Sequence, residues 1–229
     1  MVDCEKEDKG MKDLKLGFKL IRYGYKLKTN IMMLILFTAI GCMVEISTQG
    51  TNMLGGFYFM LTGMFVYQMI IYMNASDYVQ SSVMKRKLET GLPAFVSTMV
   101  YIVLFTLLLV EKYILIRMYP GNAEKYLDAL FMIILLLFGA MIFCGACYKY
   151  FVASFIVFML VVMFGVNTLN SWLYDHHIFM FKSAGLLKMA IIGYAAIIVG
   201  GILEYAVSVK LYEKPLSELA MSGLAKAAK

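Results

Sequence analysis

The sequence predicts an all-α membrane protein with six transmembrane helices and both termini in the cytoplasm, preceded by an amphipathic interfacial helix. Apolar residues make up 62% of the chain and the mean hydropathy is +0.77, which leaves too little polar surface for a soluble domain. The apolar residues form six long runs, and the basic residues lie mainly on alternate polar segments between them. Together these features exclude a soluble globular fold.

Six apolar runs have about the length that a membrane span requires. The hydrocarbon core of a bilayer is about 30 Å thick, so a helix that rises about 1.5 Å per residue needs roughly 20 apolar residues to cross it. The predicted spans are residues 31–48, 53–75, 92–110, 127–147, 151–168 and 186–208. No tandem repeat or long linker separates them, so we interpret residues 1–229 as a single transmembrane domain.

The distribution of basic residues predicts the topology, because Lys and Arg near span ends are retained on the cytoplasmic side. Most of the 21 Lys and Arg residues fall on the side of the two termini, and the other side carries Lys112, Arg117, Lys125, Lys182 and Lys188. The sequence pI near 9.0 therefore reflects topology. The chain has no basic groove with interleaved aromatic residues of the kind that binds nucleic acid.

Residues 12–28 have the pattern of a helix that lies in the plane of the lipid headgroups. A wide apolar face surrounds one narrow basic stripe, which is formed by Lys12, Lys15, Lys19, Arg22 and Lys26. Gly17 and Gly24 lie within the apolar face, where small residues would allow close contact with a transmembrane helix. The segment is either a juxtamembrane anchor or a helix that transmits a partner's movement to the first span.

The loop at residues 76–91 carries the start and stop signals of a short cytoplasmic helix. Ser82 is placed to cap its start, Gly91 to close its end, and Pro93 to begin the next span. In this helix the apolar side would hold Val83, Met84 and Leu88, and the exposed side Lys85, Arg86, Lys87 and Glu89. Such a helix could dock into a groove on a soluble partner, and an ordinary positively charged loop is the alternative.

The stretch Lys85-Arg86-Lys87-Leu88-Glu89-Thr90-Gly91, followed by Pro93, resembles the coupling loop in permease subunits of ABC-2 type exporters. Six spans with both ends inside and a basic amphipathic helix at the start are similar to the architecture of that family. The resemblance implies that a separate ATP-binding subunit, which would carry ATP and Mg, seats on Val83, Met84, Lys85, Arg86, Lys87, Leu88, Glu89 and Gly91. It also implies a homodimer or paired permease in a bacterial cell membrane, with an amphipathic peptide, lipid or drug as cargo.

Two further segments complete the predicted organisation. Residues 169–185 are too short to span the membrane and rich in aromatic residues, so we expect Trp172, Tyr174 and Phe179 at the outer interface. The family resemblance likewise implies an interfacial or re-entrant helix between the fifth and sixth spans. Residues 210–229 are predicted to form a cytoplasmic tail.

Two acidic residues lie within the predicted spans, Glu45 towards the outer end of the first and Glu204 towards the inner end of the sixth. A charged side chain at membrane depth costs at least about 2.5 to 3.5 kcal/mol on insertion scales. Each is therefore a candidate to line a transport pathway, unless it reaches the interface or pairs with a cation on a neighbouring helix. Gln68 is a weaker pathway candidate, and Cys144 and Cys147 are expected to behave as small apolar residues.

The sequence lacks the motifs of the common catalytic classes. It has no G-x-x-x-x-G-K-[ST] loop, so ATP hydrolysis would require a separate polypeptide, and it has neither H-E-x-x-H nor G-x-S-x-G. We therefore predict no catalytic, cofactor-binding or metal-binding residue in this chain. Three hypotheses remain: the membrane subunit of an ATP-driven exporter, a non-enzymatic membrane scaffold or immunity-type protein, and a passive channel or secondary transporter.

Overall fold

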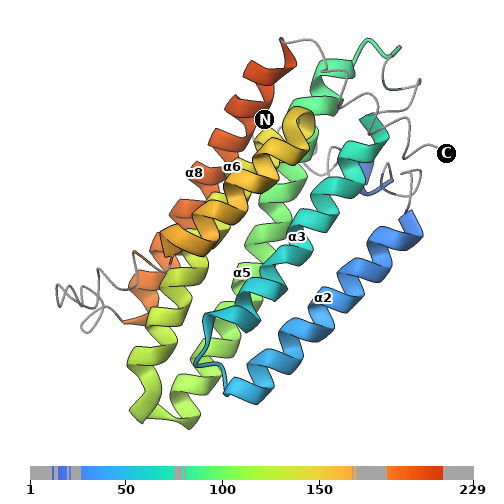
Figure 1. The fold of residues 1–229 in the computed structure, drawn as a ribbon. Helices are drawn as coiled ribbons and strands as arrows, with labels where there is room; N and C mark the ends of the chain where they lie inside the picture. The colour runs from blue at the N-terminus through green and yellow to red at the C-terminus, as the bar shows by residue number, and fades with distance from the viewer. Residues whose placement is uncertain are drawn as a thin grey trace, which may run out of the picture.

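The computed structural model describes residues 12, 15–19, 21, 27–74, 79, 81–166, 168 and 185–213. Within these residues all regular structure is helical (Figure 1). The elements are α2 (Leu27–Thr48), α3 (Met53–Asn74), the π-helical turn η1 (Lys87–Gly91), α5 (Leu92–Met118), the 3-10 turn η2 (Pro120–Asn122), α6 (Ala123–Leu160), the π-helical segment η3 (Val161–Val166) and α8 (Leu186–Tyr212). The predicted outer segment at residues 169–185 and the tail beyond residue 213 lie almost entirely outside the described residues.

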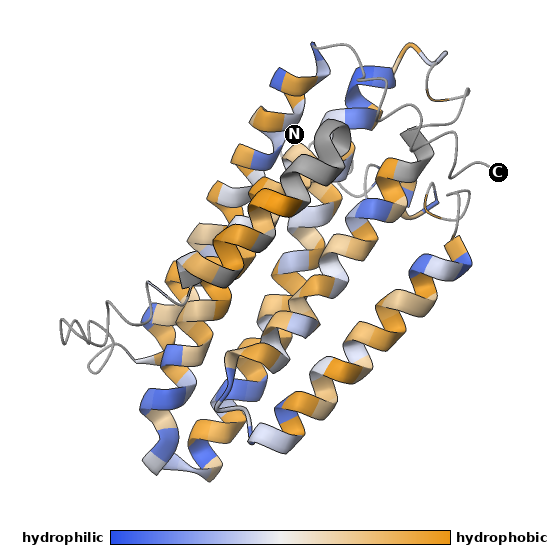
Figure 2. Cartoon of the chain, in the orientation of Figure 1, coloured by the Kyte–Doolittle hydropathy of each residue, from blue (hydrophilic) through white to orange (hydrophobic). Residues whose placement is uncertain are grey.

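Five of the described segments are long and apolar enough to cross a membrane: Leu27–Thr48, Met53–Ile71, Lys87–Met118, Pro120–Cys147 and Leu186–Tyr212. They cover the predicted first, second, third, fourth and sixth spans. Apolar residues dominate the middle of these helices, and polar residues concentrate towards the two ends of the bundle (Figure 2). The structure therefore confirms that these five segments are helices, each long and apolar enough to cross a membrane.

The two ends of the bundle are distinguished by their connections (Figure 1). Residues 49–52 and 119–122 lie at one end, which we call the outer end after the predicted topology. Residues 81–91 and the end of α8 lie at the opposite end, which we call the inner end. Which end of the bundle faces the cytoplasm stays a prediction.

The predicted fifth span, residues 151–168, lies on a helix that folds back on itself. The rings of Phe143 and Phe158 are 5.1 Å apart between centroids, whereas a straight helix would separate these residues by about 22 Å. Val162 likewise packs against Met132 and Leu136. Since the backbone of α6 is helical throughout Ala123–Leu160, the chain reverses direction within that helix, and Figure 1 shows its gold second part beside its yellow-green first part. As a sixth membrane span, this segment stays a prediction.

Glycines set the closest contacts between helices. A Cβ atom added at Gly41 of α2 would lie 3.0 Å from the backbone nitrogen of Phe59 and 3.1 Å from the carbonyl oxygen of Gly55, both on α3. On α8, Gly193 faces the ring of Phe105 and Gly200 faces Met141. Gly193 and Gly200 of the sixth predicted span therefore serve packing within the chain.

Candidate functional site

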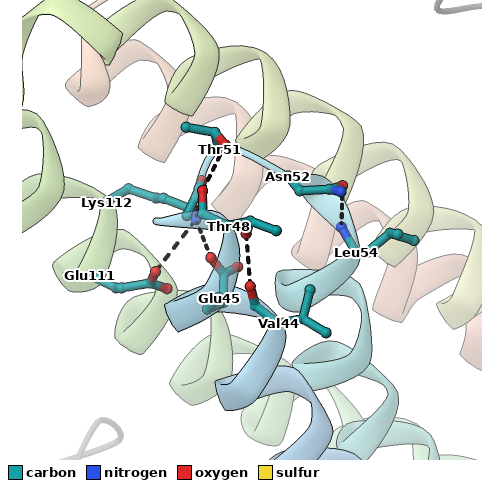
Figure 3. A network of polar contacts seen from close by, with 9 residues as sticks. Val44, Glu45, Thr48, Thr51, Asn52, Leu54, Glu111 and Lys112 are labelled. Carbon is teal, nitrogen blue, oxygen red and sulfur yellow. Dashed lines mark hydrogen bonds and ion pairs between the residues drawn. The ribbon is translucent and has the colours of Figure 1, made fainter.

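A buried ion pair joins α2 to α5 at the outer end (Figure 3). The Nζ atom of Lys112 lies 3.0 Å from Oε2 of Glu45, and it also donates a hydrogen bond of 2.9 Å to the carbonyl oxygen of Gly50. Glu111 lies at the edge of this group, 3.5 Å from the same nitrogen. The Lys112 side chain is fully buried. Of the alternatives weighed for Glu45, the structure therefore shows a cation on a neighbouring helix.

The local sequence around residue 50 makes room for this ion pair. Gln49 and Gly50 both adopt left-handed backbone conformations, with φ of 51° and 69°, and such a turn favours glycine because a Cβ atom strains it. The turn directs the Gly50 carbonyl towards Lys112. At Gly55 a Cβ atom would lie 2.6 Å from Cγ of Glu45, so a side chain at this position would collide with the glutamate.

The charge count placed Lys112 on the outer side, beyond the end of the third span; the outer side stays a prediction, but the position beyond the helix end is wrong. The third span was predicted to end at residue 110, but α5 continues to Met118 and buries Lys112 within the bundle. Four apolar or aromatic residues follow the lysine, 113–116, and they extend the helix beyond the two charges. The adjacent charges of Glu111 and Lys112 were thus taken as the end of the third span, although apolar residues resume after them.

A second polar cluster surrounds Glu204 towards the inner end, at the junction of four helices. The Ser97 hydroxyl of α5 donates a hydrogen bond of 3.2 Å to Oε2 of Glu204 on α8. Tyr67 of α3, Tyr101 of α5 and Cys144 of α6 are close enough to Glu204 to interact with it electrostatically. Glu204 has no exposed surface, so it does not reach the membrane interface directly.

The close packing of α6 on α8 encloses the polar cluster around Glu204. A Cβ atom at Gly145 would lie 2.8 Å from the carbonyl oxygen of Glu204 and 3.0 Å from its Cα atom, so only glycine allows this approach. One helical turn further along α8, the Ser208 hydroxyl lies 3.5 Å from the carbonyl oxygen of Gly145. Cys144 and Cys147 are buried free thiols, which is consistent with their expected behaviour as small apolar residues.

The predicted coupling segment begins as expected but ends differently. The Met84 amide donates a hydrogen bond of 3.1 Å to the Ser82 hydroxyl, which is the predicted cap. Gly91 does not close the helix: its φ and ψ of −71° and −40° are right-handed, and the Leu92 amide donates to the Lys87 carbonyl across it. The segment therefore runs without interruption through η1 into α5.

The exposure of the coupling residues departs from the predicted two-sided helix. Val83 and Met84 are exposed, as is Arg86, while Lys85 and Lys87 are partly buried. Leu88 packs against the cluster formed by Ile70, Leu92 and Val96. Glu89 was predicted to be exposed, and this is wrong: only 2% of its surface is accessible, because the η1 turn belongs to the base of α5. The exposed apolar surface here is thus Val83 and Met84.

The amino-terminal segment contacts the same region of the bundle. Among its described residues, Leu16 and Ile21 pack against the cluster of Ile70, Leu92 and Val96. Gly17 is buried, and a Cβ atom there would lie 2.6 Å from a methyl carbon of Val96. The predicted close approach of this glycine to a transmembrane helix is therefore confirmed, whereas Gly24 lies outside the described residues.

The remaining pathway candidate, Gln68, is partly buried on α3 beside Tyr67. Sequence reasoning missed Tyr67 and Tyr101 as members of the Glu204 cluster, because tyrosines are distributed over the whole chain and nothing in their spacing marks these two. It also missed Lys112 as the partner of Glu45. A search for charged residues with apolar runs both before and after them would have found the pair Glu111 and Lys112.

Comparison of the chain with protein-family models, with curated proteins and with solved structures gives no match. The class of protein therefore follows from composition and fold alone. Five helices that are long and apolar enough to span a membrane indicate a multi-pass membrane protein.

Proposed function

We propose that this chain is the membrane-spanning subunit of an ATP-driven exporter in a bacterial cell membrane. In this proposal it pairs with a second permease copy and couples to a separate ATP-binding subunit that carries ATP and Mg. The cargo class is an amphipathic peptide, lipid or drug. The charged stretch 85–91, with its resemblance to exporter coupling loops, is the sequence feature that motivates the proposal.

One structural observation gives it the most support: the amino-terminal segment and the coupling segment rest on the same apolar cluster. Leu16 and Ile21 of the former and Leu88 of the latter all pack on Ile70, Leu92 and Val96. A subunit that binds at the inner end would therefore contact both segments together. Exposed Val83 and Met84 supply apolar anchors, and exposed Lys15, Lys19 and Arg86 supply positive charge around them.

The continuity of η1 with α5 provides the mechanical step. Because no break separates residues 87–91 from α5, a displacement of the coupling segment is passed to α5 as to a rigid lever. That helix carries Ser97 towards the inner end and Lys112 towards the outer end, so its movement would act on both buried polar clusters. The short π-helical turn marks the point where such a movement would enter the bundle.

The test replaces the exposed anchors and leaves the packed residues intact. Val83→Asp combined with Met84→Asp is expected to abolish co-purification of the ATP-binding subunit without reducing the amount of inserted protein. Leu88 is not used, because its substitution would also damage the apolar cluster. Tyr119→Asp, exposed at the outer end, is the matched control.

The experiment is a detergent pull-down of the full chain from its native gene cluster, with mass spectrometry and an ATPase assay. A stoichiometric partner with Walker motifs that is lost only in the double variant supports the proposal. A wild-type chain that purifies without such a partner overturns it in favour of a scaffold or passive pore. Retention of the partner by the double variant overturns the assignment of residues 83 and 84 as anchors.

A further inference from the structure

Three buried polar atoms in the Glu204 cluster have no hydrogen-bond partner among the described residues. They are Oε1 of Glu204 and the hydroxyl oxygens of Tyr67 and Tyr101. Ser208 lies near Tyr67 and Cys144 near Tyr101, but neither contact reaches hydrogen-bond geometry. Buried polar groups in proteins are nearly always paired, and in the membrane interior water does not satisfy them from outside. Three unpaired oxygen atoms in one region therefore point to a bound species.

The charge of the cluster limits what that species can be. Every group identified around Glu204 is a hydroxyl, a thiol or a backbone carbonyl, contributed by α3, α5, α6 and α8: Tyr67, Ser97, Tyr101, Cys144, Gly145, Cys147 and Ser208. The ion pairs found among the described residues at membrane depth involve Lys112, at the opposite end of the bundle. One buried carboxylate therefore requires one positive charge from outside the described side chains.

We propose that Glu204, together with Ser97, Tyr67 and Tyr101, forms a site that binds one monovalent cation in the membrane interior, either a proton or Na⁺. The available ligands are oxygen atoms, which suit a hard cation. A single carboxylate balances a single charge, and a divalent ion would leave one charge uncompensated in an apolar environment. This inference does not rest on the proposed exporter function, because it needs neither an ATP-binding subunit nor a cargo.

Two measurements on the purified full-length chain in detergent separate the two cations. The first is the melting temperature as Na⁺ replaces choline at constant ionic strength; a Na⁺ site predicts a rise that saturates with Na⁺ concentration. The second is the infrared difference spectrum between wild type and Glu204→Gln; a bound proton predicts a carbonyl band of a protonated carboxyl group that only the wild type shows. The control is Glu213→Gln, an exposed substitution just after the same helix; it should keep the Na⁺ response of the wild type and show the same carboxyl band.

The glutamine variant also tests the charge argument directly. Because its neutral amide requires no cation, it is expected to fold and to lose the response to Na⁺ or the carboxyl band. If the wild type shows neither effect, the site does not hold a monovalent cation and the inference fails. The side chain of Lys149 lies outside the described residues, so this lysine is the competing source of the positive charge. The inference also fails if Lys149→Gln lowers the stability of the wild type but not that of Glu204→Gln. Lys149 would then supply the charge that compensates Glu204.

Discussion

Lys112 on α5 donates hydrogen bonds both to the carboxylate of Glu45 on α2 and to the backbone carbonyl of Gly50 in the turn that follows α2. A single buried ammonium group thereby fixes both the helix and the turn against α5. The side chain of Glu45 is only 11% exposed, so neither charge of the pair is solvated by water to the usual extent. The contribution of such a pair is best measured by removing one partner at a time.

Lys112→Met is expected to destabilise the protein by about 3–5 kcal/mol, because it leaves the buried Glu45 carboxylate without a partner. The double variant Glu45→Gln/Lys112→Met should recover most of this loss, since it buries no uncompensated charge. The measurement is denaturant unfolding in detergent, with the exposed Lys125→Met as control. Equal losses in the single and double variants would show that packing, and not charge, determines the effect.

Gly41→Ala is expected to destabilise the contact between α2 and α3 by about 1–3 kcal/mol, the usual range for an added methylene group in a packed interior. The new methyl group would meet backbone atoms of Phe59 and Gly55, which cannot move aside as a side chain can. Gly121→Ala is the control, because a Cβ atom there meets nothing within 4 Å. Thermal unfolding of the two variants should separate them, and equal melting temperatures would contradict the close contact.

Gly17→Ala should release the amino-terminal segment from the bundle, because its methyl group would overlap Val96. Limited trypsin digestion after the exposed Lys15 and Lys19 measures this release. Cleavage is expected to be faster in Gly17→Ala and to return towards the wild-type rate in Gly17→Ala/Val96→Ala, where the smaller residue makes room. If the second substitution increases cleavage further, the glycine contact does not hold the segment.

The reversal within α6 predicts that thiols introduced at positions 143 and 158 lie within reach of a short cross-linker. In a variant whose four native cysteines are replaced, Phe143→Cys with Phe158→Cys should be joined within one chain by a short bifunctional thiol reagent, because the two rings are in contact. Phe143→Cys with Met43→Cys is the control, since Met43 is an exposed residue of α2. A straight helix would give no cross-link in either pair.

Much of the helical arrangement was predictable because the signal is simple. Long apolar runs determine where five helices lie, and Gly17 was expected to contact a span because small residues permit close approach. Pairing of Glu45 with a cation was among the alternatives. The partner itself was not found, because the adjacent charges Glu111 and Lys112 were taken as the end of a span and the helix continues through them.

The Glu204 cluster was less predictable, for a physical reason. Its members come from four helices, and each member alone has an ordinary explanation within its own helix. Only packing brings Tyr67, Tyr101 and Cys144 near the carboxyl group. The same holds for Glu89, which the local pattern places on an exposed face and the continuation of η1 into α5 buries.

The pairing of Glu45 with Lys112 has a consequence for biosynthesis. The helix α2 packs mainly on α3, so these two helices can pack together before α5 has been made. The ribosome makes Glu45 long before Lys112, and the nascent α2–α3 hairpin therefore contains an acidic residue whose partner has not yet been synthesised. Arrival of α5 completes the ion pair, which makes this contact a late step in membrane assembly and a point where an incomplete chain differs chemically from a finished one.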